Sequence, residues 1–156
     1  MSADFTPITL HYLHRSGWVP NRQVSVGPAV TALEAEGYPV SEAAREFLKQ
    51  FGGLTILFPH HQIVGQEDDL RVDPLRAIQG IWPERVAKYS ERAGEELCLV
   101  GEVYRGHMAL LMGASGRLYA GADELLLLLG ASARDALDGL CRGAAPTELP
   151  DAAVSG

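Results

Sequence analysis

The chain has 156 residues, of which 47% are hydrophobic and 21% are charged, and its 20 acidic side chains against 13 Lys and Arg give a formal net charge of −7. A chain of this length buries roughly 68–70% of the surface that its unfolded form exposes, which supports a core without a metal or disulfide bond. The composition excludes an intrinsically disordered protein, and the acidic balance disfavours binding to a nucleic-acid backbone and favours a basic partner.

The first part of the chain predicts two helices joined by a turn. Residues 6–17 begin with a capping Thr and a first-turn Pro, and apolar residues then recur at helical spacing until a Gly. The next segment, WVPNR at 18–22, predicts a turn that carries a large aromatic side chain. Pro20 fixes φ there, and Asn21 tolerates the left-handed conformation. A shorter helix is expected over residues 27–37.

An amphipathic helix and a strand follow. Ser41 is the N-cap of a helix that has a clear apolar face and ends at Gly52. The apolar run 54–58, stopped by a Pro, predicts a strand that leaves this helix directly. Weaker strand candidates, at 63–64 and 70–72, flank the acidic residues 67–69, which we expect to form a loop.

The rest of the chain changes from helix to strand and back to helix. A helix is expected over 83–94 and another over 132–143. Between them, short apolar runs predict an antiparallel meander with a hairpin turn at 113–116; the runs are 97–100, 108–112 and 117–120. Small and polar residues dominate afterwards, so we expect one domain over 1–143 and a flexible C-terminal tail over 144–156.

This order of elements predicts an α+β fold, with a mainly antiparallel sheet and helices packed on one side. No apolar run approaches the roughly 18–20 residues that span a bilayer, and the first residues lack the pattern of a signal peptide. A cytoplasmic protein is therefore expected. Cys98 and Cys141 lie far apart in apolar contexts, which predicts two reduced, buried thiols.

His60, His61, Glu67 and Asp68 include the ligand types of a divalent-metal site, so a small metal-assisted hydrolase is one hypothesis. Two observations weaken it. Adjacent histidines in an extended segment point to opposite faces, and no HExxH motif occurs. Nucleophile and phosphate-binding motifs are also missing, and the arginines are too scattered for a nucleic-acid surface. We expect no catalytic residue, no metal and no cofactor.

Four short segments occur in the order found in the third group of the SUKH superfamily, which the chain resembles over roughly residues 8–143. They are GWVPNR at 17–22, FLKQFGGL at 47–54, GRLY at 116–119 and ALDGLCRG at 136–143. The usual turn of this family is GWxPGR, and here Asn21 replaces the second glycine. Because Asn also adopts the left-handed conformation, the departure preserves the turn.

The resemblance implies an immunity protein of a bacterial polymorphic toxin system. Such a protein is a small α+β domain that binds a cognate toxin domain and blocks it without catalysis. The resemblance also implies a toxin that is a nuclease or a nucleic-acid deaminase, hence a basic active site, with which the charge of −7 is compatible. Some superfamily members resemble cell-wall or signalling adaptors, so a regulatory scaffold for an endogenous protein is the alternative.

The residues of the family motifs are expected to maintain the fold: Trp18 to anchor the first helix against the sheet, Arg22 to bond a carboxylate or carbonyl, and the glycines to form turns. These residues are Gly17, Trp18, Pro20, Arg22, Phe51, Gly52, Gly53, Gly116 and Tyr119. Recognition of the toxin is expected on a loop instead. The candidates are the acidic residues Glu67, Asp68, Asp69 and Asp73 with the flanking His60 and His61.

Overall fold

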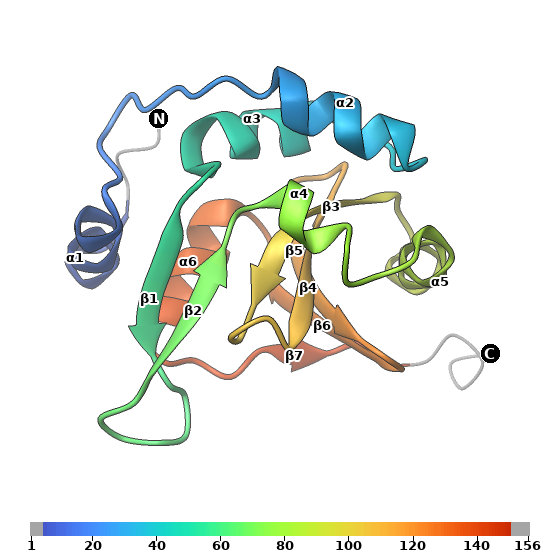
Figure 1. The fold of residues 1–156 in the computed structure, drawn as a ribbon. Coiled ribbons are helices and arrows are strands. Elements are labelled where there is room, and N and C mark those ends of the chain that lie inside the picture. Colours follow the sequence, from blue (N-terminus) through green and yellow to red (C-terminus); the bar gives the residue numbers. More distant parts are fainter. Residues whose placement is uncertain (1–4, 151–156) are drawn as a thin grey trace.

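The computed structural model describes residues 5–150, which form six helices and seven strands (Figure 1). The helices are α1 (Pro7–Ser16), α2 (Gly27–Ala35), α3 (Glu42–Phe51), α4 (Pro74–Ala77), α5 (Pro83–Ala93) and α6 (Ala133–Cys141). The strands are β1 (Thr55–Pro59), β2 (Glu67–Arg71), β3 (Leu97–Val103), β4 (Met108–Gly113), β5 (Leu118–Ala122), β6 (Leu125–Gly130) and β7 (Thr147–Glu148). These strands form one sheet in chain order, and every neighbouring pair is antiparallel. The predicted α+β fold is confirmed.

Helices contact both faces of the twisted sheet (Figure 1). On one face, α1 packs on β1, α6 packs on β6, and Met112 of β4 lies beside Phe51 of α3. On the other face, Gly121 of β5 lies under Tyr89 of α5, so closely that an added Cβ would come within 2.6 Å of the ring. The register explains why these residues face opposite sides. Met112 pairs with Leu118, and Gly121 lies three residues further along β5. Because side chains alternate along a strand, Met112 and Gly121 belong to opposite faces. The helical layer expected on one side is thus joined by α4 and α5 on the other.

Four helix boundaries lie at the capping residues predicted from the sequence. The side-chain oxygens of Thr6, Ser41 and Ser132 each accept a hydrogen bond from the backbone N–H three residues later, at the start of α1, α3 and α6. Helix α1 ends at Gly17, whose φ of 97° is left-handed. Such caps satisfy backbone groups that a helix leaves unpaired, which is why these boundaries could be read from the sequence.

Trp18 lies in the core directly after α1, with 2% of its surface exposed. Its ring stacks on Phe51 of α3, with centroids 6.3 Å apart and planes 11° apart. Phe5 meets it edge-on at 5.6 Å. The aromatic contacts of Trp18 therefore join the start of the chain to α3, and through α3 to the sheet.

The turn after Trp18 holds the end of α3. Asn21 follows Pro20 and has the left-handed φ of 67° that the family pattern requires. Arg22 then donates two hydrogen bonds, from Nη1 to the carbonyl oxygen of Gln50 and from Nη2 to that of Gly52, both at 2.9 Å. These carbonyls lie at the C-terminal end of the helix, where a cation is favourable.

The glycines among the remaining motif residues lie in tight turns, and Tyr119 forms a hydrogen bond. Gly52 has no room for a side chain, since an added Cβ would lie 2.5 Å from a main-chain oxygen of α3, and Gly53 has a φ of +85°. Gly116 closes the turn between β4 and β5. Tyr119 donates a hydrogen bond of 2.7 Å from its hydroxyl to Oε2 of Glu95.

The segment between β1 and β2 differs from the prediction in two ways. The acidic residues 67–69 were expected in a loop, but they form most of β2 and pair with residues 57–59 of β1. Residues 63 and 64 were expected in a strand, but they lie in the connecting loop. The cause is Asp68, which takes an inward position opposite Phe58 and so removes the apolar alternation that marks a strand.

Three short elements, α4, β6 and β7, were not predicted. Strand β6 is a run of leucines without alternation, and it completes the sheet beside β5. Strand β7 pairs with Leu127 and Leu128, so the sheet continues into the segment expected as the start of the tail. Residues 151–156 of that tail, like residues 1–4, lie outside the described residues. Over residues 5–150, no helix is both long enough and apolar enough to span a bilayer.

Candidate functional site

The loop that joins β1 to β2 extends from the edge of the sheet (Figure 1). A backbone hydrogen bond of 2.8 Å from His60 to Gln66 closes its base. At its tip, Ile63 is 47% exposed and Val64 is 100% exposed. Two adjacent exposed apolar side chains at the tip of a closed loop provide a small contact surface. We call residues 60–67 the hairpin end.

The two histidines of the hairpin end have different environments. Their rings stack, with centroids 5.2 Å apart and planes 4° apart. Nδ1 of His60 accepts hydrogen bonds from the backbone N–H groups of Gln62 and Ile63, each at 3.1 Å. These two hydrogen bonds hold the backbone of the loop against the His60 ring. The ring of His61 lies 6.3 Å from that of Tyr104, in the turn between β3 and β4.

The three acidic residues of β2 alternate in orientation, as a strand requires. Glu67 forms an ion pair of 2.9 Å between Oε2 and Nη1 of Arg15 in α1. Asp69 accepts a hydrogen bond of 3.0 Å at Oδ1 from the backbone N–H of Arg105. Asp68 is only 6% exposed and lies on the inner side of the strand. A partner can thus reach Glu67 and the outer side of β2, but not the Asp68 side chain.

The structure does not bring all the predicted recognition residues together. His60, His61 and Glu67 share the hairpin end, whereas Asp73 follows the opposite end of β2. There its Oδ1 accepts a hydrogen bond of 3.2 Å from the backbone N–H of Arg76, and Asp73 is the N-cap of α4. A local capping role therefore accounts for Asp73.

The hydrolase hypothesis lacks a converged ligand set. Over residues 5–150, no group of three or more His, Cys, Asp or Glu side chains could hold a metal ion. Cys98 and Cys141 are free and buried, which confirms that prediction. Burial raises the pKa of Cys98 to about 12 and that of Cys141 to about 11, so both thiols stay protonated and unreactive near neutral pH.

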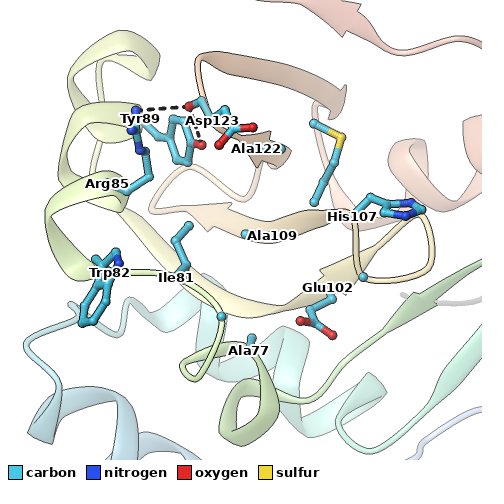
Figure 2. A pocket seen from close by; sticks show the side chains of 14 residues that line it. Ala77, Ile81, Trp82, Arg85, Tyr89, Glu102, His107, Ala109, Ala122 and Asp123 are labelled. Carbon is cyan, nitrogen blue, oxygen red and sulfur yellow. Dashed lines mark hydrogen bonds between the residues drawn. The ribbon is translucent and has the colours of Figure 1, made fainter.

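A hollow of about 360 Å³ lies between α5 and the middle strands of the sheet (Figure 2). Small residues of β4 and β5, including Ala109 and Gly121, form part of its lining. Figure 2 shows Trp82, Glu102 and Asp123 around it. We call this feature the Trp82 hollow. No recognition residue predicted from the sequence lies in it.

Trp82 is the most exposed large aromatic residue of the described chain, at 77%. It is the N-cap of α5, in an extended conformation with φ −98° and ψ 145°, and its side chain makes no capping hydrogen bond. Pro83 causes this geometry, because a residue before proline avoids the helical region. A Trp immediately before a helix-starting Pro is a signal from which an exposed aromatic could have been expected.

Ion pairs neutralise most charges around the Trp82 hollow. Arg85 pairs with Glu124 at 3.2 Å and also donates to the carbonyl oxygen of Asp123. Glu102 pairs with Arg76 at 3.1 Å. Within residues 5–150, the carboxylate of Asp123 has no hydrogen-bond or ion-pair partner, although Arg85 and Arg92 bond main-chain carbonyl oxygens of the same turn.

The turn between β3 and β4 connects the hairpin end to the Trp82 hollow. Tyr104 contacts His61, and Nη2 of Arg105 donates a hydrogen bond of 2.7 Å to the carbonyl oxygen of Glu67. The next two residues, Gly106 and His107, line the hollow. The turn therefore borders both features.

The family model of the SUKH-3 immunity protein matches residues 5–143, which is most of the chain. The chain belongs to the SUKH-3 immunity protein family. No curated protein and no solved structure matches it significantly. Membership confirms the resemblance seen in the sequence motifs. It supports an immunity role for the protein, with a cognate toxin as partner.

Proposed function

We propose that this SUKH-3 protein binds a cognate bacterial toxin domain and neutralises it by covering its active site, with no chemistry of its own. The family match over residues 5–143 carries this proposal. The buried thiols of Cys98 and Cys141, which stay protonated near neutral pH, are in accord with it. The protein would act in the cytoplasm of the producing cell, where the toxin is synthesised.

The toxin domain is proposed to be a nuclease or a nucleic-acid deaminase. Enzymes that bind nucleic acid present basic surfaces to the phosphate backbone. A protein with a net charge of −7 is attracted to such a surface, and long-range attraction accelerates encounter. In this proposal the inhibitor occupies the place of the nucleic-acid substrate and is negatively charged, as that substrate is.

The hairpin end is the proposed toxin-binding surface. It combines the exposed apolar tip at Ile63 and Val64 with His61 and the half-exposed acid Glu67. Apolar contacts surrounded by polar groups are the usual composition of a protein interface. The hairpin end is also a loop on a rigid sheet, which is where recognition residues commonly lie.

Calorimetric titration of the purified chain with the toxin domain from the neighbouring reading frame tests this function. We expect the double variant Ile63→Ser/Val64→Ser to raise Kd at least tenfold while leaving Tm nearly unchanged, because neither side chain contributes to the core. The control is Ile8→Ser/Val19→Ser, which alters the same residue types at exposed positions, 46% and 56%.

Two results would count against the proposal. Absence of any complex with the wild-type chain would refute toxin binding itself. A normal complex with equal affinity for the hairpin variant and its control would keep the function but remove the hairpin end from the interface.

A further inference from the structure

We propose that the Trp82 hollow receives a Lys or Arg side chain of the toxin domain. The inference rests on the proposed function and specifies the chemistry that the partner presents to this part of the surface. It depends on three features of the hollow: the exposed indole of Trp82, the unpaired carboxylate of Asp123, and the turn that borders both the hollow and the hairpin end.

The fold gives no reason for a Trp at position 82. With 77% of its surface exposed, the side chain adds little to the core. Trp is also a poor N-cap, because it lacks the side-chain oxygen with which Ser, Thr, Asp and Asn bond the first turn. Large exposed aromatic residues are enriched where proteins bind partners, and Trp in particular supplies much of the affinity at such places.

The charges of the hollow favour a cation as its occupant. The carboxylate of Asp123 has no partner among the described residues, while Arg85 pairs with Glu124 and donates to the main-chain carbonyl of Asp123. Glu102 adds a second carboxylate, with its side chain 19% exposed, and only its Oε1 accepts from Arg76. A cation placed over the indole gains cation–π attraction in addition to these carboxylates. An acidic or purely apolar side chain would gain neither.

The size of the hollow suits a single long side chain. Its volume of about 360 Å³ is near the lower end of the roughly 300–1,000 Å³ of small-molecule sites. The space exists because Ala109 and Gly121 are small and because Tyr89 is fixed above Gly121 by a hydrogen bond of 2.8 Å from its hydroxyl to the carbonyl oxygen of Asp123. Figure 2 shows Ala109 on the strand at the back of the hollow, with Trp82 on one side and Glu102 on the other.

The usual size of a protein–protein interface also supports a toxin-binding surface that includes the Trp82 hollow. A stable protein–protein interface buries about 800 Å² on each partner, which a loop of eight residues does not provide alone. The turn at Tyr104 to His107 borders both the hairpin end and the hollow. A toxin domain that covers the hairpin end and this turn reaches the rim of the Trp82 hollow.

The first test is the affinity of the toxin domain for two variants of the full chain. Trp82→Ala should raise Kd about 30-fold, since it removes a central aromatic contact. Asp123→Asn should raise Kd about fivefold and weaken the dependence of Kd on salt, because only the charge is lost. Asn tolerates the left-handed φ of 50° at this position, so the turn is kept. The control Val19→Ala, at an exposed apolar position between α1 and α2, should stay within twofold of the wild type.

The second test is acrylamide quenching of tryptophan fluorescence. Trp18 is buried and Trp82 is exposed, so the difference between the wild type and Trp82→Phe reports Trp82. We expect the toxin domain to protect this signal. A complex of unchanged affinity with Trp82→Ala, or a Trp82 signal that stays fully quenchable, would overturn the inference while leaving the proposed function intact. Protection of Trp82 without any effect of Asp123→Asn would overturn the cationic occupant. Absence of a complex with the wild type would refute both proposals.

Discussion

Replacement of Trp18 by Ala should destabilise the fold rather than abolish binding by the folded protein. The side chain is 2% exposed and its ring packs against Phe51 and Phe5. Truncation of a buried aromatic costs about 3–5 kcal/mol, and loss of two aromatic pairs places Trp18 in the upper part of that range. For a chain of this size, 4 kcal/mol corresponds to a fall in Tm of about 8–16 °C.

Urea unfolding followed by far-ultraviolet circular dichroism measures this loss. Trp18→Phe is the matched variant, and it should lose less than half as much. The phenyl ring retains most of the aromatic contact, and within residues 5–150 the buried Nε1 of Trp18 has no hydrogen-bond partner to lose. If Trp18→Ala kept the wild-type Tm and yet failed to bind the toxin domain, Trp18 would be an interface residue and its place in the core would be refuted.

Further predictions concern stability. Arg22→Met should lower the free energy of unfolding in urea by about 2–3 kcal/mol, because two charged hydrogen bonds to α3 are lost, and an unchanged midpoint would contradict this role. Burial disfavours ionisation of Glu95, but hydrogen bonds from Tyr119 and its other neighbours outweigh it and lower the pKa below the usual 4.5. Ionised Glu95 thus stabilises the fold at neutral pH. The difference in free energy of unfolding between the wild type and Glu95→Gln should shrink when the pH is lowered below about 4.5. Gly121→Ala should lower the free energy of unfolding by about 1–3 kcal/mol, because the added methyl group meets the ring of Tyr89. A Tm equal to that of the wild type would show that the ring can move.

The parts of the fold that the sequence predicts well are those set by local chemistry. Helix α3 has a capping Ser41, a strong apolar face and a glycine at its end, and each signal acts within a few residues. The turn at 113–116 and the helix begun by Ser132 are of the same kind. No distant contact is needed to determine where these elements begin and end.

Strands β2 and β6 are hard to predict from the sequence because they form only through pairing with distant segments. Asp68 occupies an inward position of β2, which the alternation of apolar residues cannot reveal. The sequence of β6 shows no alternation either, because five leucines follow one another, and the three from 127 to 129 are all partly buried. Such runs become strands through their neighbours in the sheet, not through intrinsic propensity alone.

The candidate site was predicted only in part for a similar reason. The hairpin end is contiguous in sequence, so His60, His61 and Glu67 could be identified together. The Trp82 hollow combines α5, β3 and the turn after β5, and its unpaired charge appears only once Arg85 is known to engage Glu124. Tertiary packing, rather than any motif, creates that surface.

Protection of living cells tests immunity most directly. The toxin domain of the neighbouring reading frame and this chain would be expressed from separately induced promoters, and surviving colonies counted. The account predicts that the toxin domain alone kills the cells and that the wild-type chain restores growth. Continued killing while the folded chain is present in excess over the toxin domain would contradict the account.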